Sequence, residues 1–408
     1  MTDLLWPGDA RADDIFDDAV IVDAMVAVEQ AWLDALVVAG IAPAAARVEL
    51  RPLVSGEDIP RLALDAEWGG NPAVPLVELL RERAVECGAE ATAWVHRGLT
   101  SQDVLDTALM IAAREALSAV RAELRHQVGR LVDLVEDHRS TPMVARTLTR
   151  YAVPTTFGAK AAAWLTGTLD AYDDLAAVVF PAQLGGAAGT MAAAVELAQP
   201  LPAPVEAVTS LLPDVAARLG LTPSTPWHTV RTSTTRLGDA ALRCTDAWGH
   251  LARDVLQLTR PEVGELSLVT TGGSSTMPGK QNPVLAVLVH RAALGAPPLA
   301  STLHLAAADT VDERSDGAWH LEWPTLRTLL RRTVVAGRQT SALLDGLVVH
   351  PEAMAARLVD AQDNVRAEQG TMAGLVGREP AAEYVGAVDS FVEAPLARAV
   401  AVLAQGDR

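Results

Sequence analysis

The stretch that decides the fold is residues 101–136, SQDVLDTALMIAAREALSAVRAELRHQVGRLVDLVE, which contains no proline and a single glycine. Its apolar side chains recur every four residues, at positions 104, 108, 112, 116, 120, 124 and 128. This spacing places them on one face of an α-helix. At about 1.5 Å per residue the helix would be roughly 50 Å long. A helix of this length predicts an elongated helical bundle.

The sequence on both sides continues the helical pattern. Proline, glycine and changes of periodicity divide it into further helices. We expect these helices at about 23–38, 59–66, 75–87, 155–179, 228–260 and 324–347, with another that begins at Pro283 and is interrupted at Pro297 and Pro298. Val, Ile and Thr do not alternate with polar residues in a period of two, which argues against a sheet protein.

These segments predict an all-α protein with three helical domains. We place an N-terminal helical domain at 1–88, a central elongated five-helix bundle at 89–347, and a small, shortened C-terminal helical domain at 348–408, with a break near Glu379 and Pro380. Long, alanine-rich helices present wide apolar stripes that need partners. Self-association of the bundle would cover them.

Composition narrows the classes of function. A net charge of -18 argues against nucleic-acid and anionic-membrane partners, because both need a basic patch. Cys87 and Cys244 cannot form a disulfide framework or a cysteine-based zinc site. The first residues lack a basic segment followed by an apolar one, and prolines and glycines break the long uncharged stretch between Asp174 and Glu196. We therefore expect a cytoplasmic protein.

Lysine usage points to one loop. Of 33 basic residues, only Lys160 and Lys280 are lysine, and a compact ammonium suits a tight anion site better than a guanidinium does. Lys280 lies in residues 271–283, TGGSSTMPGKQNP, a flexible Gly and Ser run before a helix. Such a loop can close over a substrate and bring N–H groups, an ammonium and an amide to one anionic oxygen. A solvated interhelical loop would explain the Gly, Ser and Pro, but not the lysine.

Three segments carry a family resemblance. Gly273 to Pro283 resembles the Gly-Ser-Ser-x-Met-Pro-x-Lys-x-Asn-Pro signature of the fumarase/aspartase superfamily. Residues 96–103, HRGLTSQD, resemble the first motif of that superfamily, and residues 145–158 resemble the second. The resemblance implies three helical domains and a homotetramer whose active sites take one motif from each of three subunits. It implies no cofactor, and no His and carboxylate group has the spacing of a metal site.

Within the superfamily the chain is most similar to the bacterial 3-carboxy-cis,cis-muconate cycloisomerases, which group with adenylosuccinate lyase. Further segments support this placement. They are residues 71–76 (NPAVPL), 183–190 (QLGGAAGT), 226–229 (PWHT) and 317–323 (GAWHLEW). The resemblance implies a di- or tricarboxylate as the substrate.

The shared chemistry implies roles for the serine loop. Removing a proton from carbon beside a carboxylate produces an intermediate with two negative charges, which needs fixed donors and a base. The resemblance places the base at Ser274 or Ser275, and we favour Ser275. Lys280, Asn282 and main-chain N–H groups would stabilise the serine alkoxide and the intermediate.

The other two motifs imply substrate contacts. Thr100, Ser101 and Gln102 would hold a second carboxylate at a helix N-terminus, where free N–H groups attract anions. His96 stands where related lyases have a functional histidine and is the candidate proton donor or ligand-orienting group. Thr147 matches the threonine of the second motif.

The chain also departs from both groups of relatives. Leu148 replaces the histidine of adenylosuccinate and argininosuccinate lyases. Arg150 and Tyr151 replace the Gln-Gln usual in cycloisomerases, and Arg97 replaces an aromatic residue. Arg150 adds a cation that could suit an additional carboxylate or a nitro group. These departures concern specificity more directly than mechanism.

Three functions therefore remain in view. The first is a cycloisomerase acting on 3-carboxy-cis,cis-muconate or a similar polycarboxylate. The second is an elimination lyase that cleaves a substituted succinate to fumarate or a related product. The third is a non-catalytic helical scaffold, against which the complete set of Ser274, Ser275, Lys280 and Asn282 argues.

Overall fold

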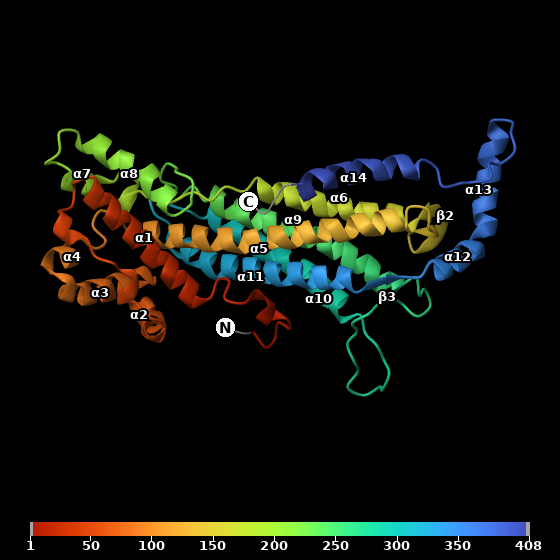
Figure 1. The fold of residues 1–408 in the computed structure, drawn as a ribbon, viewed down its shortest axis with the longest axis horizontal. Coiled ribbons are helices and arrows are strands. Elements are labelled where there is room, and N and C mark those ends of the chain that lie inside the picture. Colours follow the sequence, from red (N-terminus) through yellow and green to blue (C-terminus); the bar gives the residue numbers. More distant parts are fainter. Residues whose placement is uncertain (1–2, 405–408) are drawn as a thin grey trace. The chain divides into compact units, whose positions relative to one another are not determined.

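The computed structural model describes residues 3–404, and helices dominate it (Figure 1), which confirms the all-α prediction. The long helices are α1 (Asp18–Val38), α5 (Ser101–Asp137), α6 (Phe157–Ala176), α9 (Thr232–Leu258), α10 (Val284–Ala308) and α11 (Gly317–Asp345). The shorter helices are α2 (Ile59–Gly69), α3 (Ala73–Ala84), α4 (Ala89–Trp94), α7 (Ala192–Leu197), α8 (Pro204–Arg218), α12 (Pro351–Asp360), α13 (Gln362–Leu375) and α14 (Val388–Ala404). The strands are β1 (Pro142–Thr147), β2 (Arg150–Thr156), β3 (Leu266–Leu268) and β4 (Leu347–Val349).

Helix α5 follows the sequence prediction closely. It runs for 37 residues and ends one residue beyond the expected position. The apolar residues of its four-residue repeat are all buried, from Val104 at one end to Val128 at the other. The repeat is therefore the buried face of the helix, as a helical period of 3.6 residues requires.

Two expectations based on proline were wrong. Helix α10 continues through Pro297 and Pro298, and α11 begins at Gly317 with Pro324 inside it. A proline removes one N–H and disturbs the helix locally. Both prolines of α10 and Leu294 before them are exposed, so water can bond the carbonyl groups that lose a partner. The sequence shows where a proline lies but not whether its turn of helix faces solvent.

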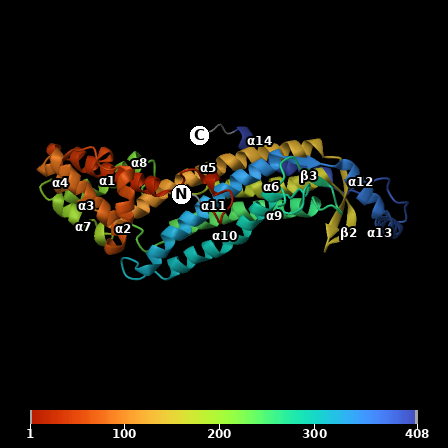
Figure 2. The same cartoon turned by 90° about the horizontal axis from the view of Figure 1, so that it is seen from below.

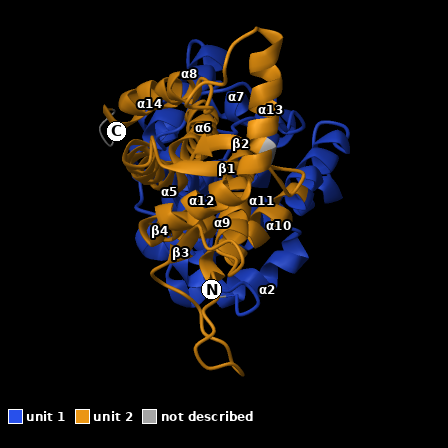
Figure 3. Cartoon of the chain, turned by 90° about the vertical axis from the view of Figure 1, so that its right-hand side faces the viewer, with its two compact units in different colours: residues 1–118, 178–239, 298–332 blue, residues 119–177, 240–297, 333–408 orange. Residues whose placement is uncertain are grey.

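The chain divides into two compact units (Figure 3). Unit 1 contains residues 1–118, 178–239 and 298–332, and unit 2 contains residues 119–177, 240–297 and 333–408. Helices α5, α9, α10 and α11 contribute residues to both units. The boundary between the two units cuts through the long helices and does not correspond to the ends of the expected domains. The division into three domains therefore stays a prediction.

In unit 1, α1 packs against α8, and α3 packs against both α2 and α4. In unit 2, α14 packs against α6 (Figure 1). The antiparallel hairpin β1–β2 contacts α12 and α13, which lie beside it in both views (Figures 1 and 2). Val144 of this hairpin forms a small core with Ala361 and Val365. Strands β3 and β4 form the second antiparallel pair.

Helix α10 has a further property of its own. Among residues 3–404 it is the one helix whose length and mean hydropathy would suffice to cross a membrane, and 28% of its most apolar window is buried. A single such helix is weak evidence for a membrane span, because exposed apolar helix faces also serve other contacts.

Candidate functional site

The first motif, residues 96–103, lies in unit 1 at the start of α5. The backbone N–H of Thr100 donates to Asp103 Oδ2 at 3.0 Å, which is one half of a capping box. The hydroxyl of Thr100 accepts a hydrogen bond from Arg314 Nη1 at 2.9 Å. Arg314 also lies over the ring of Trp319 and has no carboxylate partner among residues 3–404. An unpaired cation therefore stands beside Thr100, and no sequence signal had pointed to Arg314.

Asp103 does more than cap the helix. Its carboxylate is fully buried and accepts hydrogen bonds from the N–H groups of Gly185 and Gly186, both at 2.9 Å, and from Gln183 Nε2 at 3.0 Å. Hydrogen bonds to a carboxylate are stronger than neutral ones. Asp103 thus fixes the 183–190 segment against the first motif.

Gln102 is part of this buried layer. It is fully buried, and its amide donates to Asp106 Oδ2 at 3.1 Å and to the carbonyl of His228 at 2.9 Å. Ser101 remains partly accessible. Three residues of this motif were expected to bind a carboxylate of the substrate. Ser101 is the accessible one, Thr100 is nearly buried, and Gln102 is fully buried.

A buried ion network lies under the motif. The side chain of Arg231 is 1% exposed and bonds Asp106 at 2.7 Å and Glu322 at 3.0 Å, both of them buried. Although burial disfavours the charged guanidinium, Asp106 and Glu322 raise the pKa of Arg231. Burial raises the pKa of Glu322 despite that guanidinium. Trp319 Nε1 also donates to Asp106, at 2.9 Å. A cation fully enclosed by carboxylates holds this end of α5 in one arrangement.

His96 adopts an unusual backbone conformation in the same motif. Its φ of 63° lies in the left-handed region, which costs a non-glycine residue about 1–2 kcal/mol. The side chain is 17% exposed, and Nδ1 lies 2.6 Å from Glu29 Oε1 of α1. Such strain persists where the surroundings enforce it, often at functional sites.

The second motif forms the hairpin β1–β2 of unit 2. Thr147 pairs with Arg150 at its end, and Leu148 and Thr149 form a two-residue turn with φ of 49° and 70°. Positive φ at both positions is the geometry of a type I′ hairpin. Leu148 is 96% exposed, so the residue that replaces a lyase histidine stands at the exposed tip.

Arg146 fixes the hairpin through an ion pair. Its guanidinium makes a two-point pair with the fully buried Glu265, at 2.8 and 2.7 Å. Burial opposes the charged guanidinium, yet Glu265 raises the pKa of Arg146. A two-point pair fixes orientation as well as position. The ion pair of Arg146 therefore fixes the position of the hairpin end that carries Thr147 and Arg150.

A polar cavity of about 540 Å³ opens beside the hairpin in unit 2. Its polar lining residues are Arg146, Thr149, Arg150, Tyr151, Lys160, Asp254, Gln257, Arg260 and Glu262. Lys160 pairs with Asp254 at 3.2 Å, so one of the two lysines has a carboxylate partner in the fold. Arg150 has no carboxylate partner among residues 3–404, so its guanidinium stays available to an anion.

The serine loop, residues 271–283, is exposed for most of its length. Gly272 and Asn282 close it through two backbone hydrogen bonds of 2.9 and 2.8 Å. The Ser274 hydroxyl accepts from the N–H groups of Thr276 and Met277, at 3.3 and 3.1 Å. The amide of Asn282 donates to the carbonyl of Gly273 at 3.2 Å.

Two groups in the loop have no such bonds. Within residues 3–404, neither the Ser275 hydroxyl nor the Lys280 ammonium has a hydrogen-bond or ion-pair partner. No hydrogen bond or ion pair joins the loop to Thr147 or Arg150 in that range. The loop thus shapes itself through Ser274 and Asn282 and leaves Ser275 and Lys280 free.

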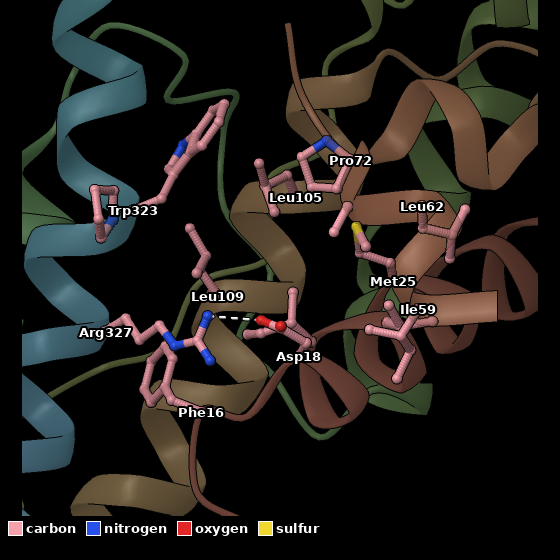
Figure 4. Close-up of a pocket in the computed structure, with 14 residues that line it drawn as sticks. Phe16, Asp18, Met25, Ile59, Leu62, Pro72, Leu105, Leu109, Trp323 and Arg327 are labelled. Carbon is pink, nitrogen blue, oxygen red and sulfur yellow. Dashed lines mark hydrogen bonds and ion pairs between the residues drawn. The ribbon is translucent and has the colours of Figure 1, made fainter. Parts of the chain in front are cut away.

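An apolar cavity of about 290 Å³ lies elsewhere in unit 1 (Figure 4). Leu105 and Leu109 of α5, Met25, Leu62 and Trp323 contribute to its wall. Its charged residues, Asp18 and Arg327, pair with each other at 2.6 Å. A polycarboxylate would find no free cation there, and no predicted site residue lines this cavity.

Comparison with known proteins identifies the family of the chain. The sequence pattern of a lyase family matches residues 73–294, which is more than half of the chain. The chain therefore belongs to this family of lyases and cycloisomerases in the fumarase/aspartase superfamily.

Relatives with different activities share this similarity. A nitrosuccinate lyase of Streptomyces davaonensis is 41% identical over 84% of this chain and 73% of its own length. A 3-carboxy-cis,cis-muconate cycloisomerase of Bradyrhizobium diazoefficiens is 36% identical over 94% of this chain and 84% of its own length. The crystal structure of a 3-carboxy-cis,cis-muconate lactonizing enzyme from Pseudomonas putida superposes with a TM-score of 0.82 at 29% identity, covering 96% of this chain and 97% of that one.

Proposed function

We propose that this chain is a cycloisomerase that acts on 3-carboxy-cis,cis-muconate or a similar polycarboxylate. The observation that carries the proposal is the serine loop with a free Ser275 hydroxyl and a free Lys280 ammonium beside its Met-Pro turn. The cycloisomerase relatives and the lactonizing-enzyme structure cover nearly the whole chain, which supports the same activity.

The reaction adds a carboxylate oxygen of the substrate across a carbon–carbon double bond while a proton reaches the carbon next to another carboxylate. In the reverse direction Ser275 takes that proton, and the electron pair moves into the carboxylate as a dianionic aci-carboxylate. Lys280 and main-chain N–H groups of the loop would balance the added charge. Ser275 is favoured over Ser274 because the Ser274 hydroxyl already bonds two backbone N–H groups.

The first and second motifs would hold the rest of the substrate. Thr100 and Ser101 would bind a second carboxylate at the N-terminus of α5, with Gln102 supporting them from the buried layer. His96 would donate a proton or orient the ligand. Thr147 and Arg150 would contact the substrate from the hairpin, where Arg150 lines the polar cavity.

The active enzyme would be a cytoplasmic homotetramer that needs no cofactor, with each active site shared among subunits. The absence of bonds between the serine loop and the hairpin residues Thr147 and Arg150, within residues 3–404, fits this arrangement. Different copies of the chain would then supply the motifs to one site. The net charge of -18 argues against nucleic acid and anionic membranes as partners.

A second candidate function is elimination from a substituted succinate. The 41% identical nitrosuccinate lyase favours it, and so does Arg150, whose unpaired guanidinium could bind a nitro group or a further carboxylate. The same base would remove a proton from the carbon beside a carboxylate. The carbon–nitrogen bond would then break to give fumarate and nitrite.

One assay separates the two candidates. The purified enzyme is mixed with 3-carboxy-cis,cis-muconate and, separately, with nitrosuccinate. Loss of the muconate ultraviolet absorbance supports the cycloisomerase, and appearance of fumarate with nitrite supports the lyase. If neither signal exceeds the rate without enzyme, both proposals fail.

Paired serine variants test the base. Ser275→Ala should lower kcat by about 1000-fold or more, because the site loses its base. Ser274→Ala is the matched control and should retain far more activity, since its hydroxyl shapes the loop. Both variants should unfold at the wild-type temperature, because both side chains lie in an exposed loop. Equal turnover by Ser275→Ala and the wild type would contradict the assignment.

A further inference from the structure

A buried carboxylate stands behind His96. Glu29 lies on α1, its side chain has no exposed surface, and its Oε1 atom is 2.6 Å from His96 Nδ1. The other oxygen, Oε2, is also buried and has no hydrogen-bond partner among residues 3–404. The carboxylate of Glu29 has a single hydrogen-bond partner in the described chain, the imidazole ring.

The same helix face that carries Glu29 also holds the backbone next to His96. Trp32 follows Glu29 by three residues, so the two side chains leave α1 on one side. Trp32 Nε1 donates to the carbonyl of Arg97 at 2.7 Å. From α3, Arg81 donates to the carbonyl of Val95 through Nη2 at 2.9 Å and through Nε at 3.3 Å.

These contacts enclose a strained residue. The carbonyl groups on both sides of His96 are held by side chains of other helices, while His96 itself keeps a φ of 63°. The surroundings therefore impose the conformation, which a histidine would not adopt on its own. The result is a ring whose Nδ1 edge faces Glu29 and whose Nε2 atom has no hydrogen-bond partner within residues 3–404.

We propose that Glu29 is a positioning residue that keeps the proton of His96 on Nδ1, so that Nε2 is the atom presented to the substrate. The inference rests on the proposed function of His96. An ionised carboxylate can only accept a hydrogen bond, so a 2.6 Å contact requires Nδ1 to donate. With Nδ1 protonated, Nε2 is the ring nitrogen that can accept a hydrogen bond or a proton while the ring keeps its place.

One histidine–carboxylate pair of unit 1 is solvated instead of buried. His304 and Asp239 meet at 3.0 Å, but both side chains are 54% exposed. Such a pair is solvated and weakly coupled. Glu29 differs because it is sealed from water and bonds the ring of a residue in the first motif. Asp239 therefore provides a matched control.

The first test is a double-mutant cycle with Glu29→Gln and His96→Gln, using the full-length enzyme and the substrate turned over in the assay above. Glu29→Gln should lower kcat by about 100-fold with little change in KM, because the amide no longer dictates the ring tautomer. In a chain that already carries His96→Gln, Glu29→Gln should have an effect of less than about twofold, because it acts through the ring. Asp239→Asn should retain wild-type turnover.

Histidine nitrogen NMR supplies a readout independent of turnover. In wild-type enzyme labelled with ¹⁵N-histidine and assigned with His96→Gln, Nδ1 of His96 should carry the proton, and in Glu29→Gln that population should fall. Glu29→Asp serves if the glutamine variant does not fold. A wild-type His96 protonated on Nε2 alone, or equal kcat losses from Glu29→Gln with and without His96, would overturn the inference. An enzyme inactive on both substrates but with the predicted tautomer would refute the proposed function alone.

Discussion

The first motif and the serine loop differ in how the fold holds them. Around the first motif, Asp103 and Gln102 are fully buried. The Asp103 carboxylate accepts hydrogen bonds from backbone and side-chain donors, and the Gln102 amide donates to Asp106 and to the carbonyl of His228. In the serine loop, the Ser275 hydroxyl and the Lys280 ammonium have no partner among residues 3–404, and two backbone hydrogen bonds between Gly272 and Asn282 close the loop. The region proposed to bind substrate is thus preorganised, whereas the region proposed to perform chemistry can open at low cost.

The largest effect on stability should come from a substitution in the buried ion network under the first motif. Arg231→Met removes the cation between Asp106 and Glu322 and should lower the free energy of unfolding by about 3–5 kcal/mol, because two buried carboxylates lose their counter-charge. Denaturant unfolding measures it. The matched control is Arg398→Met, whose guanidinium is 40% exposed and also bonds two aspartates, Asp170 and Asp173. Equal losses in both variants would contradict the special role of burial.

In the exposed serine loop, a substitution should reduce activity without reducing stability. The two lysines of the chain test this expectation. Lys280→Met should lower kcat/KM by about 100-fold, since an ammonium near a dianion contributes a few kcal/mol to the transition state. Its unfolding free energy should change by less than about 0.5 kcal/mol. Lys160→Met should instead destabilise the fold by about 1 kcal/mol, because Asp254 loses its ion-pair partner. Steady-state kinetics and denaturant titration of both variants decide the matter. Unchanged turnover in Lys280→Met would remove the main support for the loop.

The smallest effect concerns an ion pair outside both regions. Arg83, which donates hydrogen bonds to Asp58, lowers the pKa of Asp58 from 3.8 to about 2. A lowered carboxyl pKa stabilises the fold above pH 3.8, and this contribution disappears as the pH falls through about 2. Arg83 is 39% exposed, so Arg83→Gln should cost only about 1 kcal/mol at pH 7.

The pH dependence of unfolding checks this sign. The stability difference between wild type and Arg83→Gln should be constant from pH 7 to about pH 4 and should shrink toward pH 2. A difference that grows as the pH falls would contradict the assignment of the shift to this pair. The result would also show how little a partly exposed pair contributes beside the Arg231 network.

Local sequence predicted much of the helical structure. The repeat from Val104 to Val128 gave α5 to within one residue because a buried helical face must recur with the helical period. Proline misled the prediction at Pro297 and at Pro324, because its cost depends on whether water reaches the affected turn. The hairpin of the second motif was not predicted, since Leu148 and Thr149 carry no Gly or Asn signal for their positive φ.

The sequence by itself determined the helical class and the family, because periodicity and three motifs are properties of order along the chain. Tertiary structure alone decided that Glu29 meets His96, that Arg314 stands beside Thr100, and that Arg231 is enclosed by two carboxylates. These partners are separated by tens to hundreds of positions, so no local pattern pairs them. Burial then gives each contact its strength, because an ion pair shielded from water is coupled far more strongly than the same pair at the surface.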